Sequence, residues 1–193
     1  MVNASCNSTR RMEAASEMGI PQIVSPGMWG LFTMPTADMA RWAAEGRFTV
    51  PHNEILGTAK MTLDEMVASS KLMATRLNRS NGPVAVVVPA QGFHHYDRAG
   101  KMYDNPQGRR AFIEVMRSHL KPTIELHILD CHINDSEFVD KVMELAGRLF
   151  QGIVVRDNVR QLVNLTPARE QWDRQERDTS KPQVFSYKLG RSS

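Results

Sequence analysis

The chain has 193 residues, of which 41% are hydrophobic and 23% charged, and its formal net charge is +3. This length suits one sizeable domain with its own core, and the composition excludes a largely disordered chain. The small positive charge is spread along the chain, which argues against nucleic-acid binding. No apolar run reaches the roughly twenty residues that span a bilayer, and residues 1–15 lack the apolar core of a signal peptide. We therefore expect a soluble, cytoplasmic protein that binds neither nucleic acid nor membrane.

Short elements are predicted at the start of the chain. Residues 8–18 have the spacing of a helix capped by Ser8 or Asn7, and residues 20–24 that of a short strand. Residues 37–45 predict a second helix, which Gly46 ends. A brief extended run follows at residues 48–50.

Residues 25–36 contain two prolines and two glycines, which predict a loop. The loop nevertheless carries Trp29, Leu31 and Phe32, so we expect it to pack against the core. Alternatively, the loop covers a ligand pocket or contacts a subunit partner.

The clearest helix begins at Thr62, because Thr62 and Glu65 have the spacing of a capping box. Seven side chains follow at helical intervals and are predicted to face inward: Leu63, Met66, Val67, Ser70, Met73, Ala74 and Leu77. The run at 84–88 is apolar and mostly β-branched, as in a strand that is buried on both faces.

A second strand and helix pair follows. Asn105 and Pro106 predict the start of a helix whose inner face carries Phe112, Val115, Met116 and His119. Residues 124–129 alternate apolar and polar side chains, which predicts a strand near a sheet edge. Asn134 and Glu137 have the spacing of another helix cap. This alternation predicts an α/β fold, a Rossmann-like three-layer domain with a mainly parallel sheet.

Polar residues gather directly after the two predicted strands. The first group is Gln91, Gly92, His94, His95 and Asp97, and the second is Asp130, His132, Asn134 and Asp135. Ligands in open α/β sheets bind at the carboxyl ends of the strands, so we expect both groups to lie on one rim if the strands are neighbours. His52 and Asn53 form a third candidate group.

The sequence contains no recognised metal-binding or nucleophile motif. The histidines and aspartates include residue types that bind divalent ions, but no HExxH-type spacing occurs, so we predict no metal site. Cys6 and Cys131 lie far apart and are predicted to be reduced thiols. Because neither GxGxxG nor GxxxxGK[ST] occurs, a phosphate would bind at an ordinary helix N-terminus, such as the one near Asn134.

Several segments together resemble a known family. AASEMGIPQIVSPG, VPHNE, LNRSNGPVAVVVPAQGF and LDCHINDSEFVD, in this order, are similar to the C-terminal domain of the Tm-one-like ATP-binding family, named after a plant antiviral resistance protein. His52 and Asn53 match the family's His-Asn pair, while the family commonly has Ser where this chain has His94. The resemblance associates nucleotide binding with an N-terminal domain, nearly all of which lies outside this sequence. It implies a domain at residues 1–150 that is truncated at its N-terminal edge. Residues 151–193 are largely charged and lack periodicity, which predicts a weakly structured tail.

Three hypotheses about function remain open. The first is one half of a cleft for ATP or another phosphorylated small molecule, lined by His52, Asn53, Gly92, His94, Asp97, His132, Asn134 and Asp135. The second is half of a hydrolase-like enzyme, with His94 or His132 as general base and Asp130 as its orienting carboxylate. The third is a non-catalytic module that pairs with a separate N-terminal domain or another partner through an exposed sheet edge and the Trp29 loop. A homo-oligomer is compatible with each of them.

Overall fold

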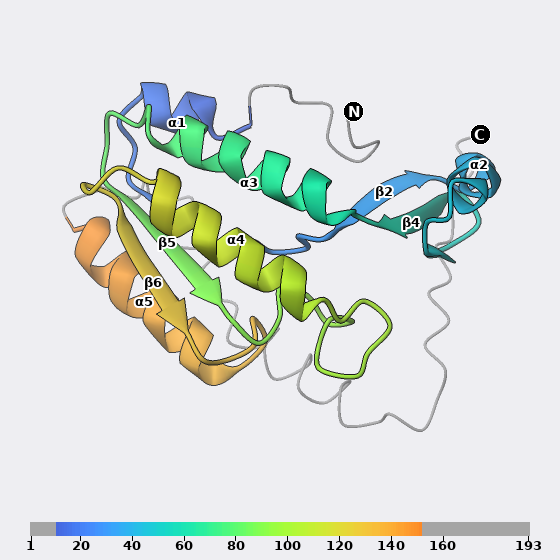
Figure 1. Cartoon of the computed structure of the whole chain (residues 1–193). Helices are drawn as coiled ribbons and strands as arrows, with labels where there is room; N and C mark the ends of the chain where they lie inside the picture. Colours follow the sequence, from blue (N-terminus) through green and yellow to red (C-terminus); the bar gives the residue numbers. More distant parts are fainter. Residues whose placement is uncertain (1–10, 152–193) are drawn as a thin grey trace, which may run out of the picture. The chain divides into compact units, whose positions relative to one another are not determined.

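A parallel sheet forms the centre of the domain. The computed structural model describes residues 11–151, and in it sheet A consists of β1 (Gln22–Val24), β5 (Val84–Pro89) and β6 (Glu125–Leu129) in the order β1-β5-β6. Both strand pairs are parallel, with Ile23 opposite Ala85 and Val87 opposite His127. The predicted Rossmann-like α/β fold is therefore confirmed, and among the strands of residues 11–151 β6 lies at an edge of the sheet (Figure 1).

Helices cover both faces of sheet A. On one face lie α3 (Leu63–Leu77) and α4 (Pro106–His119), and on the other lies α5 (Ser136–Leu149) (Figure 1). Strand β5 is buried along its whole length because its side chains alternate between two cores. Val84, Val86 and Val88 face α3 and α4, whereas Ala85 and Val87 face Leu145 of α5. This burial on both faces explains the uninterrupted apolar run in the sequence.

Most predicted helix ends are confirmed. Thr62 and Glu65 form a full capping box at α3, and the Asn105 side chain accepts a hydrogen bond from the Gly108 N–H at α4. The N-cap of α5 is Asp135, so the prediction of Asn134 was wrong by one residue. The first helix, α1, spans Glu13–Glu17 with Met12 as its N-cap, so the prediction that it starts at residue 8 with Ser8 or Asn7 as cap was wrong.

Two inward-facing predictions were wrong. Leu63 is 36% exposed and His119 is also exposed. Both lie in the terminal turns of their helices, where the helix surface extends beyond the sheet that it covers. The predicted tail at 151–193 lies outside the described residues except for Gln151.

A second, antiparallel sheet was not predicted. It consists of β2 (Leu31–Pro35), β4 (Leu56–Lys60) and β3 (Thr49–Pro51) in the order β2-β4-β3. The short helices η1 (Thr36–Asp38) and α2 (Met39–Ala44) connect β2 to β3. The prediction of a continuous loop at residues 25–36 was therefore wrong for residues 31–35, which form β2. Proline is compatible with this strand because Pro35 is its last, exposed residue. Trp29 does pack on the core, edge to face against Phe112 at 5.3 Å.

Candidate functional site

The loops that follow β5 and β6 are joined at the carboxyl edge of sheet A. Gly92 and His132 form an isolated parallel bridge, each of them three residues beyond the end of its strand. The Ile133 N–H donates to the Gly92 carbonyl at 3.0 Å, and the Gln91 N–H donates to the Cys131 carbonyl at 2.9 Å. The two predicted polar groups thus lie on one rim, as expected from neighbouring parallel strands.

Asp97 is the buried centre of this junction, with 3% of its surface exposed. One carboxylate oxygen accepts the Phe93 N–H at 2.6 Å, and the other accepts the His94 N–H at 3.1 Å. The second oxygen also lies 3.3 Å from Nε2 of His132. A short carboxylate side chain therefore closes the turn after β5 and fixes it against the loop after β6.

Both ring nitrogens of His132 are occupied by main-chain groups. Nδ1 accepts the Asn134 N–H at 3.1 Å, so the ring proton lies on Nε2 and is donated to the His94 carbonyl at 3.0 Å. The residue is fully buried. This arrangement makes His132 a connector between the loops and leaves it no free nitrogen for proton transfer from a ligand.

His94 is also buried, at 4% exposure. Its Nδ1 accepts the Tyr96 N–H at 3.4 Å, and its Nε2 lies 4.0 Å from Asp97. Burial lowers the pKa of His94, and the nearby Asp97 carboxylate opposes this effect only in part. A neutral imidazole therefore lies directly behind the rim.

Gly92 is required at this junction for steric reasons. A Cβ atom at this position would lie 2.2 Å from Cδ2 of His132 and 2.6 Å from the Asp97 carboxylate. The bare backbone lets the two loops approach each other. The glycine thus serves contacts inside the protein, in addition to any contact with a ligand.

Arg109 holds the remainder of the loop after β5, and the sequence analysis missed it. This α4 residue is 6% exposed, donates to the Asp97 carbonyl at 2.9 Å and lies 3.0 Å from the Asp104 carboxylate. Its position three residues before Phe112, on the same helix face, is the sequence signal that could have identified it. The ammonium group of Lys60 donates to the Asp104 carbonyl at 3.0 Å, which ties the same loop to the second sheet.

The surface of the rim is polar. Arg98 pairs with Asp135 at 2.5 Å, and Asp135 also accepts the His132 N–H at 2.7 Å. Arg98 is the main reason why the pKa of Asp135 is lowered, and the His132 N–H adds to the effect. Because Asp135 makes these contacts, its side chain forms no capping bond to its own helix. The N–H groups of Ser136 and Glu137 at the start of α5 therefore have no side-chain cap, whereas those of Phe138 and Val139 donate to the Asp135 carbonyl.

Comparison with known proteins fits this architecture. Residues 2–150 match the profile of an uncharacterised protein family, the UPF0261 C-terminal domain. The chain belongs to this family. A UPF0261 protein of Brucella melitensis is 32% identical over 150 residues, which is 77% of this chain and 36% of that protein. A UPF0261 protein of Clostridium tetani is 27% identical over 129 residues, which is 66% of this chain and 32% of that protein.

The resemblance to the plant resistance protein is also confirmed. The tomato ToMV resistance protein Tm-1(GCR237) is 25% identical over 149 residues, covering 74% of this chain and 20% of that protein. This chain spans about a third of the length of the bacterial UPF0261 relatives that it matches.

Some predicted site residues of this UPF0261 domain lie elsewhere. The Asn53 side chain accepts the N–H groups of Ile55 and Leu56 and so shapes the turn between β3 and β4. Two residues of β4 reach the loop after β5: the Thr58 hydroxyl lies 2.5 Å from the Tyr103 hydroxyl, and Lys60 donates to the Asp104 carbonyl. The hydrogen bonds of His52 and Asn53 within the described residues go to Thr36, Ile55 and Leu56, and none joins them to the rim.

Asp130 does not have the predicted orienting role. It is exposed and accepts a hydrogen bond from the Gln91 side chain at 2.5 Å. The carboxylate beside His132 belongs to Asp97, so that part of the enzyme hypothesis was wrong. Within residues 11–151, no group of three or more His, Cys, Asp or Glu side chains is arranged to hold a metal ion. No helix in that part of the chain combines the length and apolar character needed to cross a bilayer.

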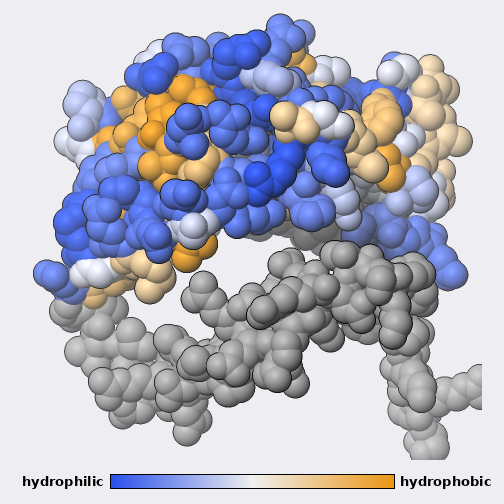
Figure 2. Space-filling view, turned by 90° about the horizontal axis from the view of Figure 1, so that it is seen from below, coloured by the Kyte–Doolittle hydropathy of each residue, from blue (hydrophilic) through white to orange (hydrophobic). Residues whose placement is uncertain are grey.

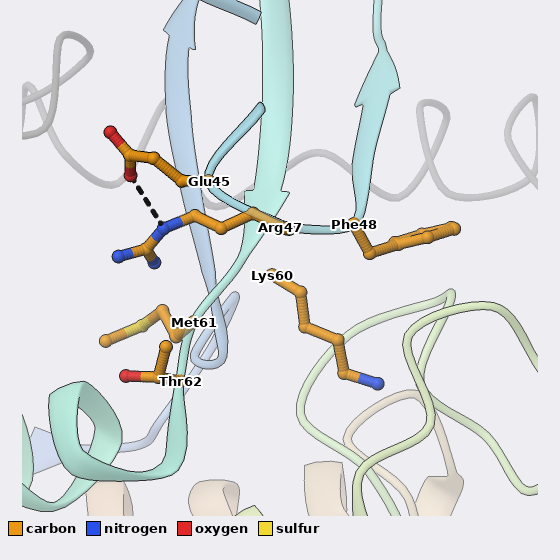
Figure 3. Close-up of a pocket in the computed structure, with 7 residues that line it drawn as sticks. Glu45, Arg47, Phe48, Lys60, Met61 and Thr62 are labelled. Atoms are coloured by element: carbon orange, nitrogen blue, oxygen red, sulfur yellow. Dashed lines mark ion pairs between the residues drawn. The ribbon is translucent and has the colours of Figure 1, made fainter. Parts of the chain in front are cut away.

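A pocket of about 390 Å³ lies at the base of the second sheet, away from the predicted residues. Figure 3 shows that its side chains diverge: Glu45 and Arg47 extend to one side, whereas Phe48 and Lys60 extend to the other. The Arg47 guanidinium is already paired with both Glu65 oxygens, at 2.7 and 2.8 Å. Ligand sites usually present polar groups that converge on one point, so the rim remains the better candidate.

Proposed function

We propose that the carboxyl edge of sheet A forms one wall of a cleft that binds a phosphorylated small molecule, with ATP as the first candidate. The observation that carries this proposal is the buried connection between the two loops through Gly92, Asp97 and His132. Such a connection fixes the exposed groups above it before a ligand arrives, which lowers the entropic cost of binding.

The exposed groups suit an anion better than a cation. The uncapped N–H groups at the start of α5 carry the positive end of the helix dipole. Asn134 and Ser136 are exposed beside them, and Arg98 reaches the same place through Asp135. A phosphate would draw Arg98 from Asp135 and form a bidentate contact with it. Among the residues proposed from sequence, Asn134 and Asp135 therefore contact or frame the ligand, while Gly92, His94, Asp97 and His132 support the wall.

The geometry gives less support to a hydrolase with a histidine base. His132 and His94 are both buried, and the ring nitrogens of His132 are both occupied. A general base must reach the proton that it removes. The interaction module remains a second candidate, because the bacterial relatives extend over about three times the matched length.

Titration calorimetry with ATP, ADP and inorganic phosphate tests the proposed cleft. We expect a phosphate compound to bind, and Arg98→Gln to weaken its binding about tenfold, the effect of a lost contact of roughly 1.4 kcal/mol. Arg110→Gln, at an exposed position on α4, is the matched control and should bind like the unaltered chain. Absence of binding by all three compounds, or equal binding by the Arg98 and Arg110 variants, would contradict the proposal.

A further inference from the structure

The loop after β1 also reaches the carboxyl edge of sheet A. Strand β1 runs parallel to β5, so both strands end at the same edge. The Met28 N–H donates to the Phe93 carbonyl at 3.1 Å, and the neighbouring Gly92 carbonyl accepts the Ile133 N–H. The loop after β5 is therefore held between the loops after β1 and β6, and all three border the rim.

The loops after β1 and β6 also approach each other. A Cβ atom added to Gly27 would lie 3.7 Å from Cδ1 of Ile133, an ordinary contact distance. Ile133 comes three residues before Ser136, where α5 begins with uncapped N–H groups. Because three residues of chain span at most about 10 Å, the turn after β1 and the proposed phosphate position are close enough for one small molecule to touch both.

Met28 has a strained backbone. The Trp29 N–H donates to the Pro26 carbonyl at 3.0 Å, which closes a turn with Met28 as its third residue. The φ of Met28 is 60°, in the left-handed region that glycine adopts easily and that a side chain makes unfavourable. The glycine of this turn, Gly27, stands one position earlier. The contacts of the turn require this backbone path, but they do not require a methionine side chain on it.

The Met28 side chain has no place in the core that would offset this strain. It is 57% exposed and belongs to none of the hydrophobic clusters of residues 11–151. Exposure of an apolar side chain is ordinary by itself, and Figure 2 shows hydrophobic residues at several places on one face of the domain. Exposure together with backbone strain is typical of residues that contact a ligand.

The Ser25 side chain in the same loop lacks a partner. Its Oγ atom is buried and has no hydrogen bond within the described part of the chain. Buried hydroxyl groups are normally paired with protein or with ordered water, so this loop has a polar group that a molecule bound beside it can satisfy. A strained apolar side chain and an unpaired hydroxyl thus occur within residues 25–28, next to the rim.

We propose that the turn after β1 holds the heteroaromatic base of a nucleotide, with the Met28 thioether against the ring. Since the phosphates of the same nucleotide occupy the position proposed above at the start of α5, this assignment rests on the proposed function. Methionine makes favourable contacts with aromatic rings through its sulfur, whereas a phosphorylated sugar or inorganic phosphate offers no ring. The ligand of the rim is therefore a nucleotide, and Met28 is the residue that distinguishes it from other phosphate compounds.

Titration calorimetry with ATP and with inorganic triphosphate separates the base from the phosphates. We expect Met28→Gly to raise the dissociation constant for ATP about tenfold and to leave that for inorganic triphosphate within about twofold. Met18→Gly is the matched control, because Met18 is 74% exposed and precedes β1, at the opposite edge of the sheet, and it should bind both compounds like the unaltered chain. In urea denaturation Met28→Gly should be at least as stable as the unaltered chain, because glycine relieves the strain.

The outcomes separate the base from the phosphate site. Equal ATP binding by the Met28 and Met18 variants would overturn the role of Met28 and leave the proposed function standing, and so would an equal loss of ATP and triphosphate binding in the Met28 variant. Lower stability of Met28→Gly would overturn it too, because the fold itself would then need the methionine. If neither compound binds to the unaltered chain, the proposed function fails and the base position fails with it.

Discussion

Replacing Gly92 with alanine should separate the two loops that form the rim. The new Cβ atom would lie 2.2 Å from Cδ2 of His132, and an ordinary contact begins near 3.4 Å, so the ring must move by about 1.2 Å. That movement disrupts the ring's hydrogen bonds to the His94 carbonyl and the Asn134 N–H, now 3.0 and 3.1 Å long. Adding the strain of overpacking to two weakened buried hydrogen bonds, we expect a loss of about 3 kcal/mol in the free energy of unfolding.

Urea denaturation followed by circular dichroism measures this loss. Gly27→Ala is the matched control, because a Cβ atom there would lie at an ordinary 3.7 Å from Ile133. We expect the control to change the unfolding free energy by less than about 0.5 kcal/mol. If Gly92→Ala costs less than about 1 kcal/mol, the junction is not as closely packed as its distances indicate and the reasoning fails.

Two further predictions concern the groups behind the rim. Burial lowers the pKa of His94 below its ordinary 6.5. Below pH 6.5 the unfolded chain therefore binds a proton at His94 more readily than the native chain does. The free energy of unfolding should be unaffected by this residue above pH 6.5 and should decrease as the pH falls below that value. His94→Gln should reduce this slope in urea titrations below pH 6.5, whereas His119→Gln, at an exposed position, should retain it. Arg109→Met should lower the free energy of unfolding by about 3 kcal/mol, because it leaves Asp104 without its buried partner. Amide hydrogen exchange should become faster in the loop from Asp97 to Asp104, which Arg109 holds. Unchanged exchange in this loop would contradict that role of Arg109.

The central layers of the fold could be predicted from sequence because each pattern had a local cause. Burial on both faces of β5 produces an apolar run, and the Thr62–Glu65 capping box fixes the start of α3. The second sheet could not be predicted in this way. Its strands contain Pro35, Pro51 and Gly57, and β2 pairs with β4 across the intervening α2 and β3. Such pairing is decided by tertiary contacts and leaves little local signal.

The candidate site was predictable only in outline. Adjacent parallel strands were enough to predict that the loops near His94 and His132 would meet. Which carboxylate lies beside His132 was not predictable, because Asp97 and Asp130 follow different strands and both are plausible partners by type. His52 was a separate candidate that the family's His-Asn pair supported, and the structure places it after the Pro51–Gly57 pair, at the end of β4 opposite to Lys60.

The connection between His132 and the loop after β5 also has an evolutionary consequence. His132 donates to the main-chain carbonyl of His94 and does not use its side chain. Selection on the connector therefore acts on the backbone path of that loop, and the identity of the side chain at position 94 can vary without breaking the connection. Homologues of this domain can thus exchange the buried side chain at position 94 while the connection between the two loops is kept.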